Sequence, residues 1–507
     1  MFSGWLTTIV FLPLAGAIII ALFVRGDKNV RWFAGIISLA ELVLSIAVFA
    51  QYDLGAGADQ FQLVDKIEDW IPVESFKVQY FLAIDGLSAP MVLLTGILGM
   101  VSVFASWSVK ERLPEYFMWL LILQSAVMGV FTSMDFFLFF IFWELELIPM
   151  FFLISIWGSK PNREYSAMKF LIFTFLGSAF MLVGILVLFF SFDTFDMTLL
   201  PDAISRGGIL LPVSLVFTMI FIAFAVKLPI WPLHSWLPDA HTDAPTAASV
   251  MLAGVLLKMG AYGMLRISAT MFPEVMAGIA WLLASVGVIN ILYGAAIVLR
   301  QTDLKRLIAF SSISHMGFVV LGLSAVVGVN GQVSTVGITG AALQMFTHGT
   351  ITGLLFLLAG FIYERTHTRH IPHLGGLATR MPMLTGALVL AGLASLGLPS
   401  TSGFVSEIHV FLGVFPVWSW LTAVGAFGVV LTAGYILWMI QRAMFGPENQ
   451  HLNNVSDATV MEMVPVAVMV AAIMVVGIYP AIIADVFTTG IQPIVDSLQI
   501  AVTASLQ

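Results

Sequence analysis

Apolar segments long enough to cross a lipid bilayer recur along the whole chain. A helix needs about 20 mostly apolar residues to cross about 30 Å of hydrocarbon, and we count about fourteen such segments. Soluble domains carry about 25% charged residues, whereas this chain of 507 residues is 60% hydrophobic and 10% charged. The sequence therefore predicts an all-α polytopic membrane protein and excludes an ordinary soluble enzyme. The predicted spans lie near residues 3–24, 30–50, 86–107, 114–131, 134–157, 165–191, 209–236, 244–268, 276–298, 304–325, 336–363, 381–412, 416–444 and 458–485.

The basic residues support this span count and orient it. Cytoplasmic loops of membrane proteins carry an excess of lysine and arginine, and with the N-terminus outside, fifteen of the 21 basic residues fall on the cytoplasmic side. The outer side receives Lys66, Lys77, Arg206 and Arg266. We therefore expect an even number of spans with both termini outside. The cytoplasmic set is Arg25, Lys28, Arg31, Lys110, Arg112, Lys160, Arg163, Lys169, Arg300, Lys305, Arg306, Arg365, Arg369, Arg380 and Arg442.

The chain contains no cysteine, so it cannot hold iron–sulfur clusters or disulfides. Any electron transfer must occur in another polypeptide. The cytoplasmic run from Glu364 to His373 has metal-ligand residue types, but its arginines and proline favour a solvated loop, and we predict no metal site. The long external segment from Gln51 to Asp85 alternates apolar and polar residues at Phe61–Asp65 and Ser75–Tyr80, which predicts a short β-hairpin. The tail after about residue 486 is short, and we expect no soluble domain.

Two predicted spans are interrupted by a proline near a charge. In span seven Lys227 precedes Pro229, and in span twelve Pro399 precedes Glu407. A charge at the bilayer centre costs about 2.5–3.5 kcal/mol on insertion scales, and a proline frees a backbone carbonyl, so such segments are stable only along a wet interior. Discontinuous helices at mid-membrane typically form ion-transport sites.

The two breaks lie five spans apart, which predicts two inverted repeats of five helices each. The expected parts are residues 1–113 (helices 1–3 with the hairpin), 114–270 (helices 4–8, the first repeat), 271–445 (helices 9–13, the second repeat) and 446–507 (helix 14 and a short tail).

Ionisable side chains within predicted spans are candidate functional groups, because they are costly in lipid. Glu144 follows Trp143 in the middle of span five and needs a cation or a proton. Glu146 is rotated from it by roughly 200° on a helix, so the two cannot share one face. For Glu146, near Pro149, a packing role and a role in the site are equally consistent with the sequence.

Lys227 and Lys258 are the two basic residues that belong to neither side, and both lie inside predicted spans. Lys258 lies too near the middle of span eight to snorkel to the interface, and Gly254 and Ala261 leave room on its face. Burial lowers the pKa of a lysine, which suits both residues to gain and lose a proton.

Histidines between the two breaks could relay protons. His315 and His348 have hydroxyl-rich neighbours, which favour this role. A single membrane histidine is often a hydrogen-bonded packing residue, and we give that interpretation weight for His234, His241 and His409.

These motifs resemble the antiporter-like subunits of respiratory complex I. The similar segments are Lys227–Gly260, Gln301–Arg306, Ser311–Gly317 and the Trp143-Glu144 motif with Pro149, and the resemblance runs nearly end to end. Most such subunits, and the related chains of multisubunit sodium/proton antiporters, carry a lysine on span twelve. The chain M type, the counterpart of mitochondrial subunit 4, carries a glutamate there, as Glu407 does here. The short tail agrees, since the chain L type adds a long lateral helix.

The resemblance implies a bacterial inner-membrane subunit of NADH:quinone oxidoreductase, with both termini periplasmic, that translocates protons driven by quinone reduction in other subunits. FMN and iron–sulfur clusters are expected in those partners and no cofactor in this chain. The expected partners are chain L and chain N type subunits, membrane lipids and protons, but no nucleic acid. The implied site residues are Glu144, Lys227, Lys258, His315, His348 and Glu407. Glu144 and Lys227 would form a switchable ion pair, the lysines and histidines would carry the proton inward, and Glu407 would load or release it.

Two other functions are compatible with these residues. A subunit of a multisubunit sodium/proton antiporter would use an ion gradient instead of redox chemistry, and a lysine in place of Glu407 would have favoured it. A scaffold that only joins neighbouring subunits would gain nothing from Lys227 and Lys258 in lipid.

Overall fold

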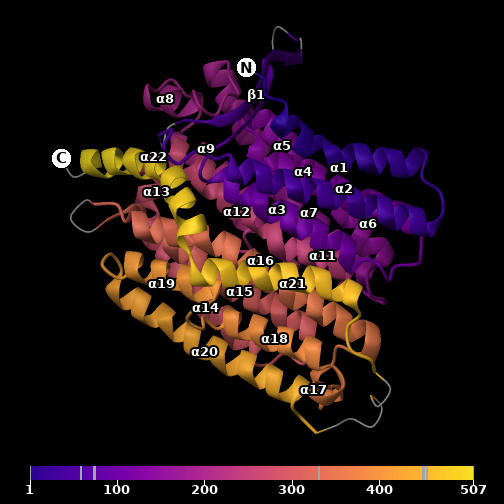
Figure 1. Cartoon of the computed structure of the whole chain (residues 1–507). Coiled ribbons are helices and arrows are strands. Elements are labelled where there is room, and N and C mark those ends of the chain that lie inside the picture. The colour runs from indigo at the N-terminus through magenta and orange to yellow at the C-terminus, as the bar shows by residue number, and fades with distance from the viewer. Residues whose placement is uncertain are drawn as a thin grey trace.

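The computed structural model describes residues 2–57, 60–71, 73, 76–328, 332–447, 452 and 455–505. Within these residues thirteen helices are long and apolar enough to cross a membrane, which confirms the predicted all-α polytopic fold (Figure 1). They are α1 (Trp5–Leu22), α2 (Asp27–Ala50), α3 (Ser88–Ala105), α4 (Leu113–Thr132), α5 with α6 (Phe136–Leu145 and Leu147–Trp157), α7 (Arg163–Phe192), the segment Thr246–Ala269, α14 (Ala280–Val298), α15 (Leu304–Leu323), α16 (Thr335–Thr366), α20 (Ser419–Met444), α21 (Val460–Ile478) and α22 (Ala481–Ser505).

Shorter helices form the two interrupted regions. The first consists of α9 (Val213–Lys227) and α10 (Trp236–Asp243), with residues 228–235 outside any helix. The second consists of α18 (Pro382–Ser395) and α19 (Ser402–Val414). Pro229 and Pro399 lie within these gaps, where a missing N–H breaks no helical hydrogen bond.

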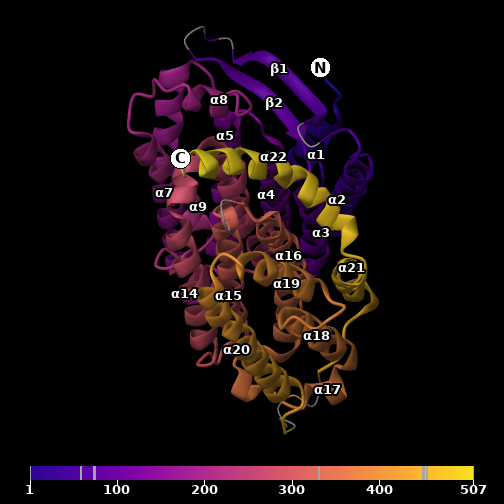
Figure 2. The same ribbon diagram turned by 90° about the vertical axis from the view of Figure 1, so that its left-hand side faces the viewer.

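Three segments form the centre of the bundle. Thr246–Ala269, Leu304–Val326 and α16 are buried along their whole apolar windows. The first of them comprises α11 (Thr246–Met251) and α12 (Leu257–Gly263), each followed by a π-helical turn, at Leu252–Leu256 and Met264–Ala269. The remaining helices surround this centre in both views (Figures 1 and 2).

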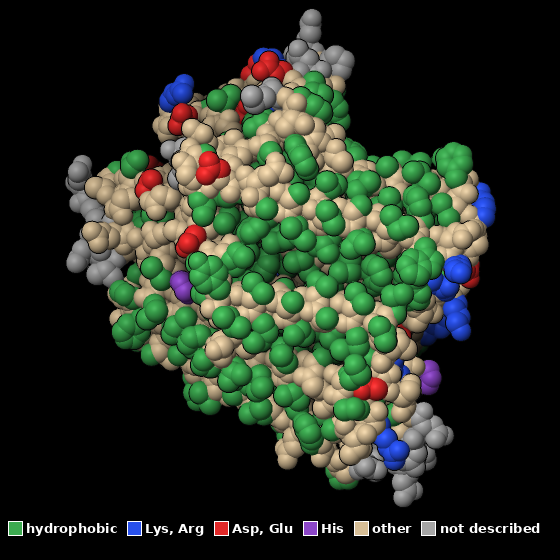
Figure 3. Space-filling view, viewed as in Figure 1, with side chains coloured by type: hydrophobic (Ala, Val, Ile, Leu, Met, Phe, Trp, Pro, Cys, Tyr) green, Lys and Arg blue, Asp and Glu red, His purple; other side chains and the backbone are tan. Residues whose placement is uncertain are grey.

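The surface is apolar around the bundle and charged at its ends. Figure 3 shows hydrophobic side chains over the middle of the molecule, most lysines and arginines at its right-hand end, and acidic residues mainly at the upper left. This separation matches the basic-residue asymmetry of the sequence.

The predicted β-hairpin is confirmed at the end opposite the basic residues. β1 (Gln62–Ile71) pairs antiparallel with β2 (Val78–Ile84), while Ser75 of the second alternating stretch lies outside the described residues. Asp65 of β1 accepts hydrogen bonds from the Ser3 hydroxyl (2.9 Å) and the Thr7 backbone N–H (2.8 Å). The hairpin therefore anchors the start of α1. We call this the hairpin side of the molecule.

The C-terminal region differs from the prediction. The sequence predicted a span at 458–485 followed by a short tail, but α21 ends at Ile478 and a separate helix, α22, follows from Ala481. Pro480 separates the two helices, and α22 packs against α3, α16 and α13 (Pro273–Gly278). It lies across the hairpin side of the bundle (Figure 2). α22 also packs closely on the residues just before α3: a Cβ on Gly86 would lie 2.2 Å from the carbonyl oxygen of Val486 in α22.

Candidate functional site

Lys227 forms a buried ion pair with Glu146. Lys227 is the last residue of α9 and is 1% exposed, and Glu146, between α5 and α6, is fully buried. The rings of Trp143 and Phe170 lie 5.3 and 5.8 Å from the lysine Nζ. The side chain therefore lies in an aromatic pocket with one carboxylate as its counter-ion.

Glu144, predicted to form a switchable ion pair with Lys227, is not the carboxylate that contacts the lysine in this structure. Glu144 is half-buried, and its Oε1 makes no hydrogen bond. Glu146 faces Lys227, while Glu144 interacts with Ser178 on α7 and is also near enough to the lysine to interact with it electrostatically. Pro149 cannot donate to the carbonyl four residues before it, and the helix is interrupted at Glu146. This local distortion hid the assignment from a regular helical projection.

The backbones that carry the two buried lysines are packed against each other. A Cβ on Gly260, two residues after Lys258, would lie 2.7 Å from Leu228 N and from Phe224 O. α12 therefore touches α9 directly at the helix break. Any larger residue at position 260 would separate the two lysines.

Lys258 is fully buried and faces α16. Its Nζ lies 2.7 Å from Nδ1 of His348 and also donates to the carbonyl of Ala253. Ala253 belongs to the π-helical turn before α12, and such turns disrupt the regular α-helical ladder and occur often at functional sites. The turn thus supplies a polar partner for the ammonium in the core of the bundle.

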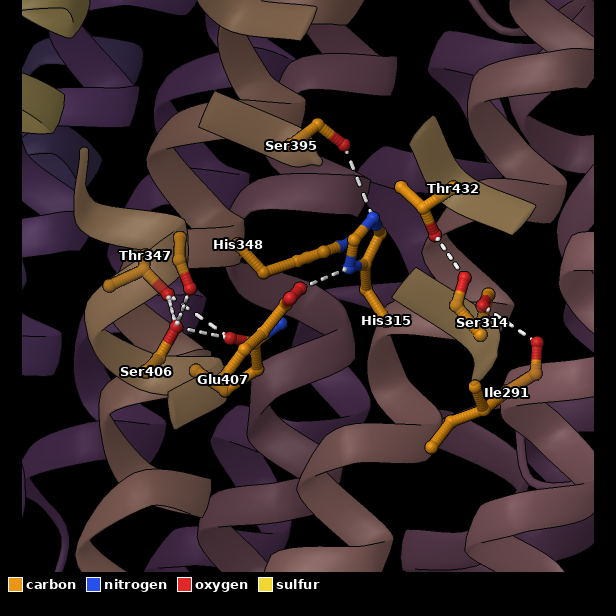
Figure 4. Close-up of polar contacts among 12 residues, drawn as sticks. Ile291, Ser314, His315, Thr347, His348, Ser395, Ser406, Glu407 and Thr432 are labelled. Atoms are coloured by element: carbon orange, nitrogen blue, oxygen red, sulfur yellow. Dashed lines mark hydrogen bonds and ion pairs between the residues drawn. The ribbon is translucent and has the colours of Figure 1, made fainter. Parts of the chain in front are cut away.

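His348, His315 and Glu407 continue from Lys258 towards the second break. The imidazole centroids of His348 and His315 are 5.6 Å apart. His315 contacts Oε1 of Glu407 through Nδ1 (3.2 Å) and the Ser395 hydroxyl through Nε2 (3.2 Å), as Figure 4 shows. Nε2 of His348 is buried without a partner.

A small cavity lies among these side chains. Its volume is about 10 Å³, and its lining includes His315, His348, Ser395 and Glu407. One water molecule needs roughly this much room and two to four polar partners. The cavity can therefore hold a water that joins the two histidines to the carboxyl group.

The second break determines where Glu407 lies. Ser395 ends α18, and Gly397 follows with φ = 80°, a backbone conformation that glycine adopts without strain. A Cβ at Gly397 would lie 3.2 Å from Glu407 Oε2. Beside Glu407, the Ser406 hydroxyl bonds to Thr347 (2.8 Å) and to the side chain of Gln344.

The other histidines are held in separate environments. His234 contacts the Tyr293 hydroxyl (3.2 Å), and His409 bonds to the Val405 carbonyl (2.6 Å) on its own helix. His241 stacks on Phe356, and both of its ring nitrogens are buried without a partner. The structure does not bring His234 or His409 into the chain from Lys258 to Glu407, whereas His241 lies close enough to Lys258, His348 and Lys305 to interact with them electrostatically.

Sequence reasoning missed the burial of Lys305. It was assigned to a cytoplasmic loop, but it is 3% exposed in the first turn of α15, and its Nζ donates to the Ala244 carbonyl (2.7 Å). Asp303 caps α15, so Lys305 two residues later belongs to the first turn of that helix and not to the loop. This position could have been recognised in the sequence. Within the described residues no group of three or more potential ligands is placed to hold a metal ion.

Residues 133–432 match the family described as "NADH:quinone oxidoreductase/Mrp antiporter, TM". The chain therefore belongs to this family of antiporter-like membrane subunits. Within it, the sequence is 39% identical to NADH-quinone oxidoreductase subunit M of Rhodobacter capsulatus, over 97% of this chain and 96% of that protein. It is 42% identical to an NAD(P)H-quinone oxidoreductase chain 4 of Synechococcus elongatus, over 97% and 92%. These relatives confirm the M-type resemblance.

Solved structures of the same fold agree. A chain of respiratory complex I from Thermus thermophilus aligns with a TM-score of 0.85 at 26% identity, covering 98% of this chain and 99% of that one. A chain of an Mrp complex from Dietzia aligns with a TM-score of 0.82 at 18% identity, covering 99% of each. At this identity, the similarity to the Mrp chain shows a shared fold only.

Proposed function

We propose that this chain is the M-type membrane subunit of an NADH:quinone oxidoreductase and conducts protons along its buried ionisable residues. The observation that carries the proposal is the run of contacts from Lys258 through His348 and His315 to Glu407, in the core of the bundle. A relay requires buried groups that exchange protons and lie within hydrogen-bond reach of one another, directly or through one water. The M-type relatives support the assignment to this enzyme.

The proposed cycle begins at the pair of Lys227 and Glu146. While the pair is closed, the carboxylate stabilises the ammonium. When it opens, Lys227 loses its counter-ion in a buried pocket, its proton affinity falls, and it passes a proton towards Lys258. In the open state, Glu144, two residues from Glu146, offers Lys227 a second carboxylate. Glu144 therefore remains one of the proposed site residues.

The second half of the path uses imidazole and carboxyl chemistry. The Lys258 ammonium gives its proton to Nδ1 of His348, and the small cavity beside His315 allows transfer onward through one water. Glu407 then accepts the proton from the side of His315 and releases it when the negative charge is favoured again. The inverted repeats 114–270 and 271–445 would each supply one helix break to this path.

The energy must come from elsewhere in the complex. The chain has no cysteine, so we place the FMN, the iron–sulfur clusters and quinone reduction in partner subunits. We also propose chain L and chain N type neighbours in the membrane arm. The basic end of the molecule would face the cytoplasm of a bacterium, which leaves the hairpin side and both termini in the periplasm.

Co-purification from native membranes tests this function. A tag on this chain should retain a flavin- and iron–sulfur-containing NADH dehydrogenase, detected by NADH:quinone activity and by the absorption spectrum. If the chain instead purifies with sodium/proton antiporter subunits and without flavin, it is a subunit of a multisubunit antiporter. If this chain with Lys258→Ala is purified within an active NADH dehydrogenase that still pumps protons normally, the chain acts only as a scaffold.

A further inference from the structure

A second buried polar cluster lies on the hairpin side of Lys258. Arg266 is 8% exposed and forms an ion pair with Asp85 (2.5 Å). The guanidinium also donates to the Ser88 hydroxyl and to the Tyr262 hydroxyl, both at 3.2 Å. The four side chains come from the entrance of α3 and from α12 with its following π-helical turn. We call them the Arg266 cluster.

The Arg266 cluster lies in line with Lys258. Lys258, Tyr262, Arg266 and Thr270 follow at intervals of four residues, and side chains at that spacing stack along one face of a helix. The Tyr262 hydroxyl is also 3.3 Å from the Phe131 carbonyl. Tyr262 follows Lys258 by one helical turn, while the lysine Nζ itself bonds to the Ala253 carbonyl on the far side from the cluster.

Beyond the cluster is a cavity that opens to the surface. Its volume is about 280 Å³, its inner wall includes Asp85 and Arg266, and α22 contributes Gly490 and Pro493. Gln60 and Thr198, which also line it, are exposed. This size and opening allow water to reach the Arg266 cluster from the hairpin side, so that the cluster is what stands between that water and Lys258.

The chemistry of the cluster opposes proton passage. A guanidinium has no acceptor and keeps its charge in proteins. Burial would raise the pKa of Asp85, but the charge and hydrogen bonds of Arg266 and the backbone N–H of Ser88 hold that pKa below its usual range. The hydroxyl of Tyr262 already contacts Ser88, Arg266 and Phe131. An approaching proton thus meets a fixed positive charge, and the only carboxylate of the cluster is held ionised by that same charge.

We propose that Arg266, held by Asp85 and Tyr262, is an electrostatic seal that prevents protons on Lys258 from escaping to the cavity on the hairpin side. Positive groups placed in a narrow polar passage exclude protons in other membrane proteins. With this route closed, a proton on Lys258 can move on only through His348. The inference rests on the proposed function, since it takes Lys258 to be a proton carrier.

The test is the passive proton permeability of the whole purified complex in liposomes. A potassium diffusion potential drives protons without NADH, and a trapped pH dye reports the flux. Arg266→Met should raise the flux about tenfold or more, because it removes a buried positive charge from the passage. Arg266→Lys should stay near the native flux, since the charge remains. Arg206→Met, which removes an exposed arginine, is the matched control.

Two further variants separate a seal from a structural clamp. Arg266→Met combined with Lys258→Met should return the flux to the native value, because the leak passes through Lys258. Asp85→Asn combined with Arg266→Gln leaves no isolated buried charge, which makes it the better tolerated variant if Arg266→Met fails to assemble, and it should leak similarly. A native flux in an assembled complex that lacks the arginine, or a leak that persists without Lys258, would overturn the seal. Normal NADH-driven pumping by Lys258→Met would overturn the proposed function instead.

Discussion

Lys227 is paired with Glu146, although Glu144 stands two residues earlier on the same transmembrane segment. Both members of the pair are buried, at 1% and 0% exposure. Removing one partner of such a pair costs about 3–5 kcal/mol, because the other charge is left buried and alone. We therefore expect Glu146 to affect both folding stability and proton transfer, and Glu144 to affect proton transfer alone.

Glu146→Gln should lower both pumping and stability. The charge that holds the Lys227 ammonium is lost, and about 3–5 kcal/mol of stability with it, which is measured as a lower thermal midpoint. Glu144→Gln should impair NADH-driven pumping without this loss of stability, since Glu144 makes no direct contact with Lys227 in the closed state. Normal pumping by Glu144→Gln would show that only Glu146 serves Lys227.

Lys227→Ala and Lys258→Ala should strongly impair coupled turnover, and Lys227→Ala should also lose about 3–5 kcal/mol of stability, because Glu146 is left buried without its counter-ion. Each removes a protonatable group, and general acid–base groups contribute about 10²- to 10⁴-fold to proton-transfer steps. NADH-driven acidification of liposomes measures the effect, with Lys110→Ala, which changes an exposed lysine, as control. Native pumping by an assembled Lys227→Ala complex contradicts the mechanism.

Glu407 tests whether the end of the path requires a titrating group. Glu407→Ala and Glu407→Gln should lose pumping, because neither side chain can exchange a proton. Glu407→Lys should retain part of it, since an amine can. If the glutamine variant pumps at nearly the native rate, Glu407 only packs against His315 at the helix break.

Gly397→Ala should disturb Glu407 without changing any ionisable group. The new methyl group would lie 3.2 Å from Glu407 Oε2, at a backbone φ of 80° that costs a non-glycine residue roughly 1–2 kcal/mol. We expect pumping to fall about tenfold through the displaced carboxyl group. Gly386→Ala, within the preceding helix α18, places its new methyl group with no atom within 4 Å and should pump normally. Equal activity of the two variants would show that the position of Glu407 is not critical.

The sequence alone was enough to predict the membrane helices and the interruptions near Lys227 and Glu407. The roles of Lys258 and His348 in proton transfer stay predictions. Predictions of helices and interruptions depend only on the free-energy cost of individual residues within an apolar segment. A charge or a proline in an apolar run is unfavourable wherever the run lies, so its presence can be interpreted without a fold. The M-type resemblance was also carried by local motifs, and the relatives confirm it.

Only the tertiary structure decided which groups meet. The choice of Glu146 over Glu144 depends on the distorted turn before Pro149 and on where α9 ends. His348 lies 90 residues from Lys258, and Asp85 lies 181 residues from Arg266, so neither contact has a local signal. The path of α22 across the hairpin side was equally hidden, because it depends on the contacts of α22 with α3, α13 and α16, which lie far from it in the sequence. Contacts between distant segments arise from packing, and packing is a property of the whole bundle.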